Sequence, residues 1–255
     1  GLMGAFQDLQ VNQASNETAA EFVRSKIRKI VKDPEMARKL SPTNTFGCKR
    51  LCVATNYYET YNRDNISLID LNDTPIKCIT ANGVRTTKRD YDVDILILAT
   101  GFDAMTGALN RINIQGTNGQ KLTDAWRNGP VSYLGLGVNG FPNMFTITGP
   151  GSPSVLTNMI PTIEQHVNWI GACLVAMSKK NATRIEAIKS AQSEWVAYNA
   201  GLADKSLRIT CDSWYLGANV SGKARVFMPF VGGLPMYIEK CEEVVREDYK
   251  GFVIT

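Results

Sequence analysis

The chain has 255 residues, of which 44% are apolar and 20% are charged, with 21 glycines and 10 prolines. This is the composition of a folded globular protein, and it excludes a disordered chain, a collagen-like repeat and a small disulfide scaffold. Lysine and arginine together number 28 and the two acidic residues 24, so the excess of positive charge is small. It is also spread along the chain, which argues against a nucleic-acid partner.

The sequence also argues against a membrane protein and a metal site. No apolar run approaches the roughly 18 residues that a membrane-spanning helix needs. The single histidine, His166, leaves too few ligands for a Cys/His zinc site. The chain begins at Gly1 without a methionine or a targeting pattern. We therefore expect no membrane partner, no metal, a cytoplasmic location, and a chain that is part of a longer one.

Helices are predicted to open the chain. Between Ser15 and Val31, apolar residues recur every three or four positions, which predicts an amphipathic helix. Asp33-Pro34-Glu35 then has the cap, the proline and the acidic first turn of a second helix start. This second helix is expected to end before Ser41-Pro42.

Residues 51–99 have the composition of short β-strands. The dipeptide Asn82-Gly83 predicts a hairpin. The continuous apolar run that ends at Ala99 lacks alternation, which is typical of a parallel strand buried on both faces. An α/β fold class follows. The predicted strands are 51–53, 66–71, 76–80 and 93–99.

The rest of the chain is predicted to mix strands and helices. The expected strands are 143–148 and 226–230. The expected helices are 156–179, 184–207 and 235–249, with a short one near 123–127. The best domain boundary lies between Asp94 and Asp103.

Two loops are candidate ligand sites. Thr100-Gly101-Phe102 follows a predicted parallel strand, where ligands bind in α/β proteins, although any tight turn also needs a glycine. The glycine-rich stretch 149–154 precedes a helix, whose free N–H groups favour an anionic or carbonyl oxygen. A plain connecting loop is the alternative.

Three further residues have two interpretations each, and His166 has one. Lys49 and Arg50 diverge along an extended chain, which suits one phosphate-binding and one catalytic cation, or two solvated charges. Trp214 lies in a glycine-rich segment and suits packing on a flat cofactor, or a core contact. His166 is interpreted as structural, because no G-x-S-x-G nucleophile motif accompanies it.

These motifs, in this order, resemble the C-terminal half of the type I Baeyer–Villiger monooxygenases, especially those acting on phenylacetone, steroids and cyclic ketones. The resemblance covers nearly the whole chain. Its most specific elements are A-T-G-F-D-A-M-T-G at 99–107 and G-P-G-S-P-S at 149–154. It also includes C-K-R-L-C at 48–52, Y-Y-E-T-Y-N-R-D-N at 57–65, and the segments 163–169 and 213–230.

The resemblance implies roles for the candidate residues. Arg50 would stabilise a negatively charged peroxyflavin. Lys49 would hold the 2′-phosphate of NADP. Thr100, Gly101 and Phe102 would lie where the chain returns from the NADP domain to the FAD domain. Trp214 would lie on a loop that closes over NADP.

The resemblance also implies a substrate pocket. Ser154, Val155, Leu156 and Met159 would line it, and the backbone N–H groups of Asn158 and Met159 would face the flavin. The implied cofactors are FAD and NADP, and the implied reaction inserts one oxygen atom of O2 into a ketone to give an ester or lactone. A monooxygenase acting on nitrogen or sulfur, and an inactive nucleotide-binding fragment, are the alternatives.

Two departures from the family pattern affect the expected fold. Ala54 stands where the family usually carries an aspartate. No G-x-G-x-x-G follows a predicted strand, so we expect a partial Rossmann-like fold of two dinucleotide-binding domains with a helical insertion, lacking its N-terminal half. The expected parts are the end of the helical insertion (1–46), the returning part of the NADP domain (47–93) and that of the FAD domain (94–255). The chain alone is expected to be inactive.

Overall fold

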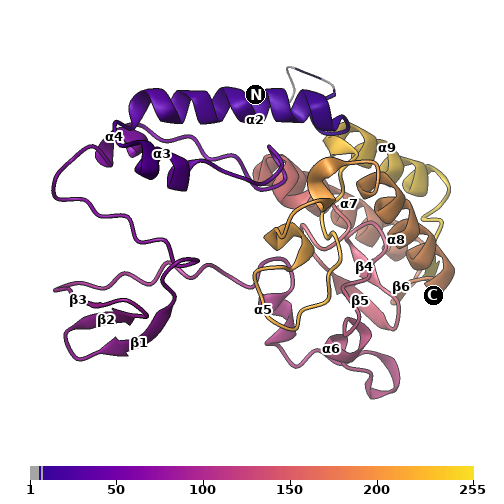
Figure 1. Ribbon diagram of the computed structural model, residues 1–255. Helices are drawn as coiled ribbons and strands as arrows, with labels where there is room; N and C mark the ends of the chain where they lie inside the picture. The colour runs from indigo at the N-terminus through magenta and orange to yellow at the C-terminus, as the bar shows by residue number, and fades with distance from the viewer. Residues whose placement is uncertain (1–5, 7) are drawn as a thin grey trace. The chain divides into compact units, whose positions relative to one another are not determined.

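The structure is a computed structural model that describes residue 6 and residues 8–255. Two compact units divide the chain, Gly1–Gly101 and Phe102–Thr255, and each is described by itself. Figure 1 labels their helices and strands. Among the described residues, no helix combines the length and hydrophobicity needed to cross a bilayer.

The first unit opens with the predicted helices, α2 (Gln13–Ile30) and α3 (Pro34–Leu40). Asp33 caps α3, because its Oδ1 accepts hydrogen bonds from the N–H groups of the next turn at 2.8 and 3.1 Å. The predicted start of α3 and its end before Ser41 are confirmed. Both helices share a small apolar cluster, and a short helix, α4 (Tyr57–Thr60), contributes to it.

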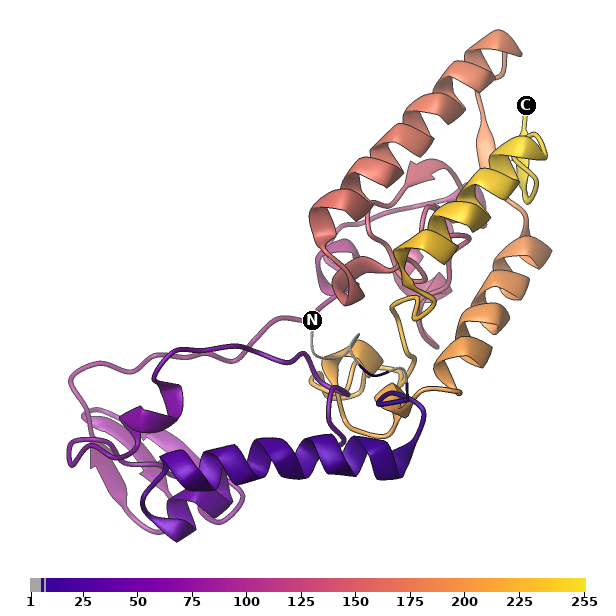
Figure 2. The same ribbon diagram turned by 90° about the horizontal axis from the view of Figure 1, so that it is seen from above.

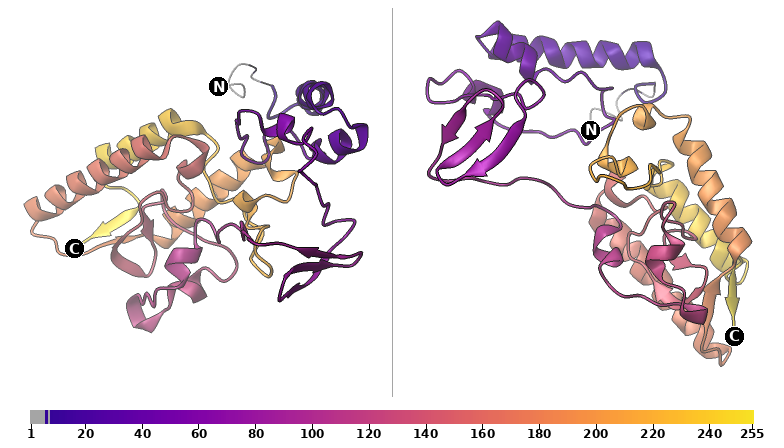
Figure 3. Two further views of the ribbon diagram at one scale, coloured as in Figure 1. Left: turned by 90° about the vertical axis from the view of Figure 1, so that its left-hand side faces the viewer. Right: turned by 60° about the horizontal axis from the view of Figure 1, so that its bottom comes forward.

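Three antiparallel strands follow, β1 (Ile76–Thr80), β2 (Gly83–Thr86) and β3 (Asp90–Asp92). They lie side by side in the right-hand view of Figure 3. The register pairs Thr80 with Gly83, which confirms the predicted hairpin. A side chain at Gly83 would lie 2.0 Å from the carbonyl oxygen of Tyr91, so this close approach requires glycine.

The other strands predicted for this unit are wrong. Residues 51–53, 66–71 and 93–99 form no strand, and the stretch of ribbon that follows the three strands in Figure 3 carries no arrow. Ile95, Ile97 and Leu98 are 79, 82 and 71% exposed instead of buried. The physical reason is that a strand needs neighbouring backbone to pair with, and no described strand pairs with this run.

The second unit has two antiparallel strand pairs and three long helices. The strands are β4 (Gly137–Val138) with β5 (Phe141–Phe145), and β6 (Ile185–Ala187) with β7 (Phe252–Ile254). The long helices α7 (Met159–Lys179), α8 (Lys189–Ala203) and α9 (Gly233–Arg246) run alongside one another in Figure 2. Shorter pieces are α5 (Gly107–Asn110), α6 (Leu122–Ala125) and the 3₁₀ turns η1 (Thr117–Gly119), η2 (Ser154–Leu156), η3 (Leu207–Ile209) and η4 (Trp214–Leu216).

An aromatic core joins these helices to the strands. Trp169 of α7, Trp195 of α8 and Tyr237 of α9 are all buried in one cluster. The rings of Trp195 and Phe230 stack with centroids 5.4 Å apart. Burial of these large rings gives the second unit its main apolar stabilisation.

Three predicted elements of this unit need correction. The helix predicted over 184–207 begins only at Lys189, because β6 takes up the preceding residues by pairing with β7. The strand predicted over 143–148 is found at Phe141–Phe145. The strand predicted over 226–230 is absent, because Met228 and Phe230 bond to loop residues 151, 152 and 215 instead of a strand ladder.

One stretch has the spacing G-x-G-x-x-G, from Gly135 to Gly140, but it contains the short strand β4 and the turn into β5, and it does not fold as a strand–turn–helix. Its first and last glycines have φ values of +72° and +85°. A side chain at Gly137 would lie 2.9 Å from the ring of Phe252. These glycines therefore serve close packing and do not form the phosphate-binding turn of a dinucleotide fold.

Candidate active site

The glycine-rich stretch before α7 is a tightly held loop. Gly151 donates its N–H to the carbonyl of Met228 at 2.7 Å, and the indole of Trp195 donates to the Gly151 carbonyl at 3.1 Å. Ser152 accepts a hydrogen bond from the N–H of Phe230 through its carbonyl. Because its backbone groups are satisfied from several elements, the loop is rigid enough to position the residues that follow it.

His166 fixes the entry to this loop. Its Nδ1 accepts the backbone N–H of Thr148 at 2.9 Å, and its Nε2 lies 2.8 Å from the hydroxyl of Tyr237. That hydroxyl donates to the carbonyl of Leu134 at 2.5 Å, so Nε2 must carry the hydrogen that the tyrosine oxygen accepts. The chain of three hydrogen bonds supports a neutral, structural histidine.

The protonation states of this chain follow from burial. Burial lowers the pKa of His166 to about 4. Burial raises the pKa of Tyr237 well above its usual range. Both side chains are therefore uncharged at neutral pH, as the hydrogen bonds require.

The predicted pocket residues are grouped at the start of α7. Ser154 is buried, and its Oγ lies 3.5 Å from the sulfur of Met105 and 4.0 Å from that of Met159. Val155 and Leu156 are partly buried. Ser154 has a φ of +41° and Met105 one of +68°, a left-handed conformation that costs a non-glycine residue about 1–3 kcal/mol.

The side chain of Asn158 caps the N-terminus of α7. The Oδ1 of Asn158 accepts the N–H of Ile160 at 3.1 Å, while the Asn158 side chain stays exposed. Met159 is the first residue of α7. The backbone groups predicted to face a flavin therefore lie at an exposed helix N-terminus that no acidic side chain of the first turn blocks.

Sequence reasoning missed the contact that Met105 makes. The residue belongs to the A-T-G-F-D-A-M-T-G element, but its type gave no reason to single it out. A thioether is a soft, adaptable group that fills gaps. Its position against Ser154 depends on a backbone turn that residue spacing does not reveal.

The second group of predicted residues consists of Trp214 and the turn at 100–102. Its ring is partly buried, with its centroid 4.4 Å from that of Tyr215. The amide of Asn219, on the same loop, donates to the carbonyl of Phe102 at 2.8 Å. The structure therefore brings the loop that carries Trp214 and Asn219, here called the Trp214 loop, to Phe102, the residue of the predicted turn that belongs to the second unit and is 89% exposed. Thr100 and Gly101 belong to the first unit and are exposed.

Lys49 and Arg50 lie together in the first unit. Both are exposed and line a hollow of about 270 Å³ with apolar side chains that include Val23 and Phe46. No aspartate or glutamate is among the described residues that line it. Two cations that line one hollow suit a phosphate or another anionic group.

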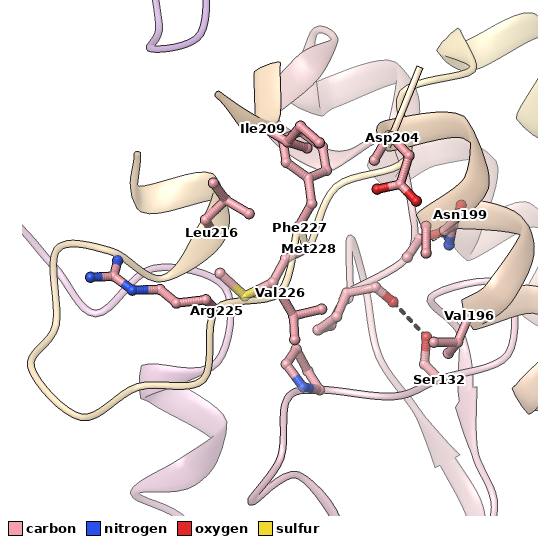
Figure 4. A pocket seen from close by; sticks show the side chains of 15 residues that line it. Ser132, Val196, Asn199, Asp204, Ile209, Leu216, Arg225, Val226, Phe227 and Met228 are labelled. Carbon is pink, nitrogen blue, oxygen red and sulfur yellow. Dashed lines mark hydrogen bonds between the residues drawn. The ribbon is translucent and has the colours of Figure 1, made fainter. Parts of the chain in front are cut away.

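A cavity of about 300 Å³ lies within the second unit, and Figure 4 shows its lining. Arg225 extends from one side of it, while Asn199 and Asp204 lie on the other. Pro150 and Gly151 of the loop contribute to its wall. None of the predicted pocket residues is among the described residues that line it.

The fit to FAD and NADP is partial. The cationic hollow at Lys49 and Arg50 suits a nucleotide phosphate. The strand, glycine turn and helix that cradle a dinucleotide pyrophosphate are not found among the described residues, since Gly135–Gly140 is a hairpin connection. The described residues thus offer a phosphate contact and a helix start, but not a complete dinucleotide site.

Comparison with known proteins shows which enzymes the chain is similar to. The chain is 40% identical over 254 residues to phenazine N-monooxygenase of Lysobacter antibioticus and 40% identical over 250 residues to cyclohexanone 1,2-monooxygenase of an Acinetobacter species. A steroid monooxygenase structure with NADP shows 46% identity and a TM-score of 0.92. The chain is thus similar, over nearly its whole length, to Baeyer–Villiger and related monooxygenases.

The alignments cover nearly the whole chain but only part of the length of each monooxygenase. It covers 99 and 98% of the chain and 46% of each of the two enzymes. The steroid monooxygenase structure is covered to 48%. A cyclohexanone monooxygenase structure from Rhodococcus sp. Phi1, with NADP⁺, has a TM-score of 0.95 and 40% identity, and is covered to 47%. The chain thus spans about half the length of the monooxygenases it matches.

No model of a protein family matches the chain. The fold expected from the sequence, a mixed helix-and-sheet part of a Rossmann-like flavoprotein monooxygenase, agrees with these structures. The roles of Lys49, Arg50, Trp214 and the pocket residues stay predictions, because sequence identity and fold do not assign them.

Proposed function

We propose that the chain forms the C-terminal half of a flavin-dependent Baeyer–Villiger monooxygenase, which uses NADPH and O2 to convert a ketone into an ester or lactone. The observation that carries the proposal is the similarity over nearly the whole chain to enzymes named for cyclohexanone and cyclopentanone oxidation. The ketone, O2 and the cytoplasmic location belong to the proposal.

The same proposal assigns each part of the chain to a domain of the enzyme. Residues 1–46 would end a helical insertion, 47–93 would complete the NADP domain, and 94–255 would complete the FAD domain. FAD and NADPH, when bound, would supply the electrons and carry oxygen from O2 to the substrate. The protein's own part is to bind, orient and stabilise charge.

Arg50 would be the catalytic residue. Its exposed guanidinium lines the hollow beside Lys49, and its fixed positive charge would stabilise a negative charge that develops during oxygen transfer. Lys49 would hold the 2′-phosphate of NADP as a point charge. Thr100, Gly101, Phe102 and Trp214 would lie against the cofactors.

The pocket would be built from the start of α7. Ser154, Val155, Leu156 and Met159 would shape the substrate side, and the N–H groups of Asn158 and Met159 would face the edge of the flavin. The loop held by Trp195 and the His166–Tyr237 chain supports this proposal, because it fixes the position of Ser154 before any ligand binds.

The role of Arg50 is tested in a joined enzyme, in which the chain completes the part of steroid monooxygenase that it does not match. The Arg50→Ala variant should lose at least about a hundredfold in ester formation, because one charge-stabilising donor is worth that much. Flavin reduction by NADPH should stay within about twofold. Ester formation by Arg50→Ala at the parent rate would contradict the role, provided that both joined proteins carry FAD.

Oxidation of a nitrogen atom is the second candidate function. The observation that favours it is the 40% identity to a phenazine N-monooxygenase. The same joined enzyme, offered a cyclic ketone and a phenazine in parallel, distinguishes the two reactions by product. An N-oxide without lactone would replace the ketone proposal.

A further inference from the structure

Two segments far apart in the sequence are tied together within the second unit. Lys223 forms an ion pair with Asp103, and its Nζ also donates to the carbonyl of Ala104 at 3.0 Å. Asn219 donates to the carbonyl of Phe102 at 2.8 Å. The loop after Trp214 is thereby fastened to the three residues that follow Gly101.

This ion pair differs from the others in its surroundings. The side chains of Lys223 and Asp103 are only 13 and 29% exposed. The neighbouring pair on the same loop, Arg225 with Asp212, spans 4.0 Å and is 53 and 91% exposed. Water screens an exposed pair, whereas a largely buried charge that loses its partner is left uncompensated. The first pair can therefore hold the loop, and the second cannot.

Two glycines make room for the pair. A side chain at Gly107 would lie 2.6 Å from Cβ and 2.7 Å from the carboxyl carbon of Asp103. At Gly217, where φ is +73°, it would lie 3.0 Å from Cδ of Lys223. Both charged side chains thus pack closely against the backbone of a glycine, where a larger residue would clash with them. The contact is therefore part of the packing of the unit.

The Trp214 loop is held well by backbone hydrogen bonds at Tyr215 and poorly toward Lys223. Tyr215 is buried, and its carbonyl accepts the N–H of Met228 at 2.9 Å. Beyond Ala218 the backbone hydrogen bonds are long: the N–H of Val220 lies 3.3 Å from the carbonyl oxygen of Gly217, and that of Lys223 lies 3.4 Å from the carbonyl oxygen of Val220. This part of the loop therefore depends on the side chains of Asn219 and Lys223 for its position.

We propose that Asp103 and Lys223 are positioning residues that hold the Trp214 loop against the turn at Phe102. The pair thereby sets where the Trp214 ring is presented to the nicotinamide cofactor. This last step rests on the proposed function, in which both the loop and the turn face NADP. The attachment itself does not depend on it.

Hydrogen–deuterium exchange of the 255-residue chain tests the attachment. In Lys223→Met, amides 216–222 should exchange at least about fivefold faster, because the partly buried carboxylate of Asp103 and the Ala104 carbonyl both lose their donor. Arg225→Met, on the same loop, is the matched control and should leave exchange unchanged. Lys223→Arg should restore most of the protection, since it keeps the charge.

Three results would overturn the proposal. The first is an exchange rate in Lys223→Met equal to that in Arg225→Met. The second is an equal rise of exchange in α9, which would indicate general destabilisation. The third is a failure of Lys223→Arg to restore protection. The exchange measurement needs no cofactor, so its result tests the attachment independently of the proposed function. In the joined enzyme, Lys223→Met should raise the KM for NADPH about tenfold, and an unchanged KM would overturn the cofactor step.

Discussion

At the scale of single residues, the neutral histidine is the clearest case of a side chain that acts through its position. His166 is fully buried between two partners, Thr148 on the loop and Tyr237 on α9. A proton on Nδ1 would remove the acceptor that Thr148 needs and place a charge in the core. Residue type alone supported a structural histidine, but the partners depend on tertiary packing.

This arrangement predicts a pH-dependent stability. The folded-state pKa of about 4 lies below the usual value near 6.5, so the stabilisation is present above about pH 6.5 and is lost as pH falls toward 4. Between pH 7.5 and 5.0 we expect the free energy of unfolding to fall by about 2 kcal/mol. Urea unfolding at the two pH values measures it.

The control for this prediction is His166→Gln, which removes the only histidine of the chain. Its stability should be lower at pH 7.5, and its dependence on pH above 5 should be nearly flat. An equally steep dependence in the variant would show that other groups cause it.

At the scale of elements, the success of sequence reasoning depends on whether an element needs a distant partner. The helices α2 and α3 and the hairpin at Asn82-Gly83 carry their own signals, in periodicity, caps and turn residues, and were predicted correctly. The run 93–99 has strand composition, but no described strand pairs with it. Composition can indicate a strand, whereas only pairing forms one.

The exposed run makes a prediction about stability. Ile97→Thr should change the free energy of unfolding of the 255-residue chain by less than about 0.5 kcal/mol, because Ile97 is 82% exposed. The same substitution at Ile27, which is 1% exposed on α2, should cost at least about 2 kcal/mol. Chemical denaturation compares the two. Similar losses at both sites would contradict the exposure of the run.

At the scale of the whole molecule, two groups of candidate site residues are each arranged within their own unit. Lys49 and Arg50 share a hollow of the first, and Ser154, Met159 and Trp214 lie in the second. The candidate residues could be predicted from motifs in the sequence. Their support, from Met105, Lys223 and His166, could not, because it arises from contacts between residues distant in sequence.

The length of the match bears on activity. The chain covers about 46% of its monooxygenase relatives, and its one G-x-G-x-x-G spacing forms a hairpin connection. The exposed apolar run adds a segment whose backbone lacks strand pairing among the described residues. We therefore expect the chain alone to bind neither cofactor tightly and to need the part of the enzyme that it does not span.

The most direct measurement is a titration of the purified 255-residue chain with FAD, followed by NADPH and O2. The account predicts no stoichiometric FAD binding and no NADPH oxidation above that of free flavin, whereas the joined enzyme binds FAD and oxidises NADPH. A yellow protein from the chain alone, with NADPH-dependent consumption of O2, would contradict the central claim that these residues supply about half of a Baeyer–Villiger monooxygenase.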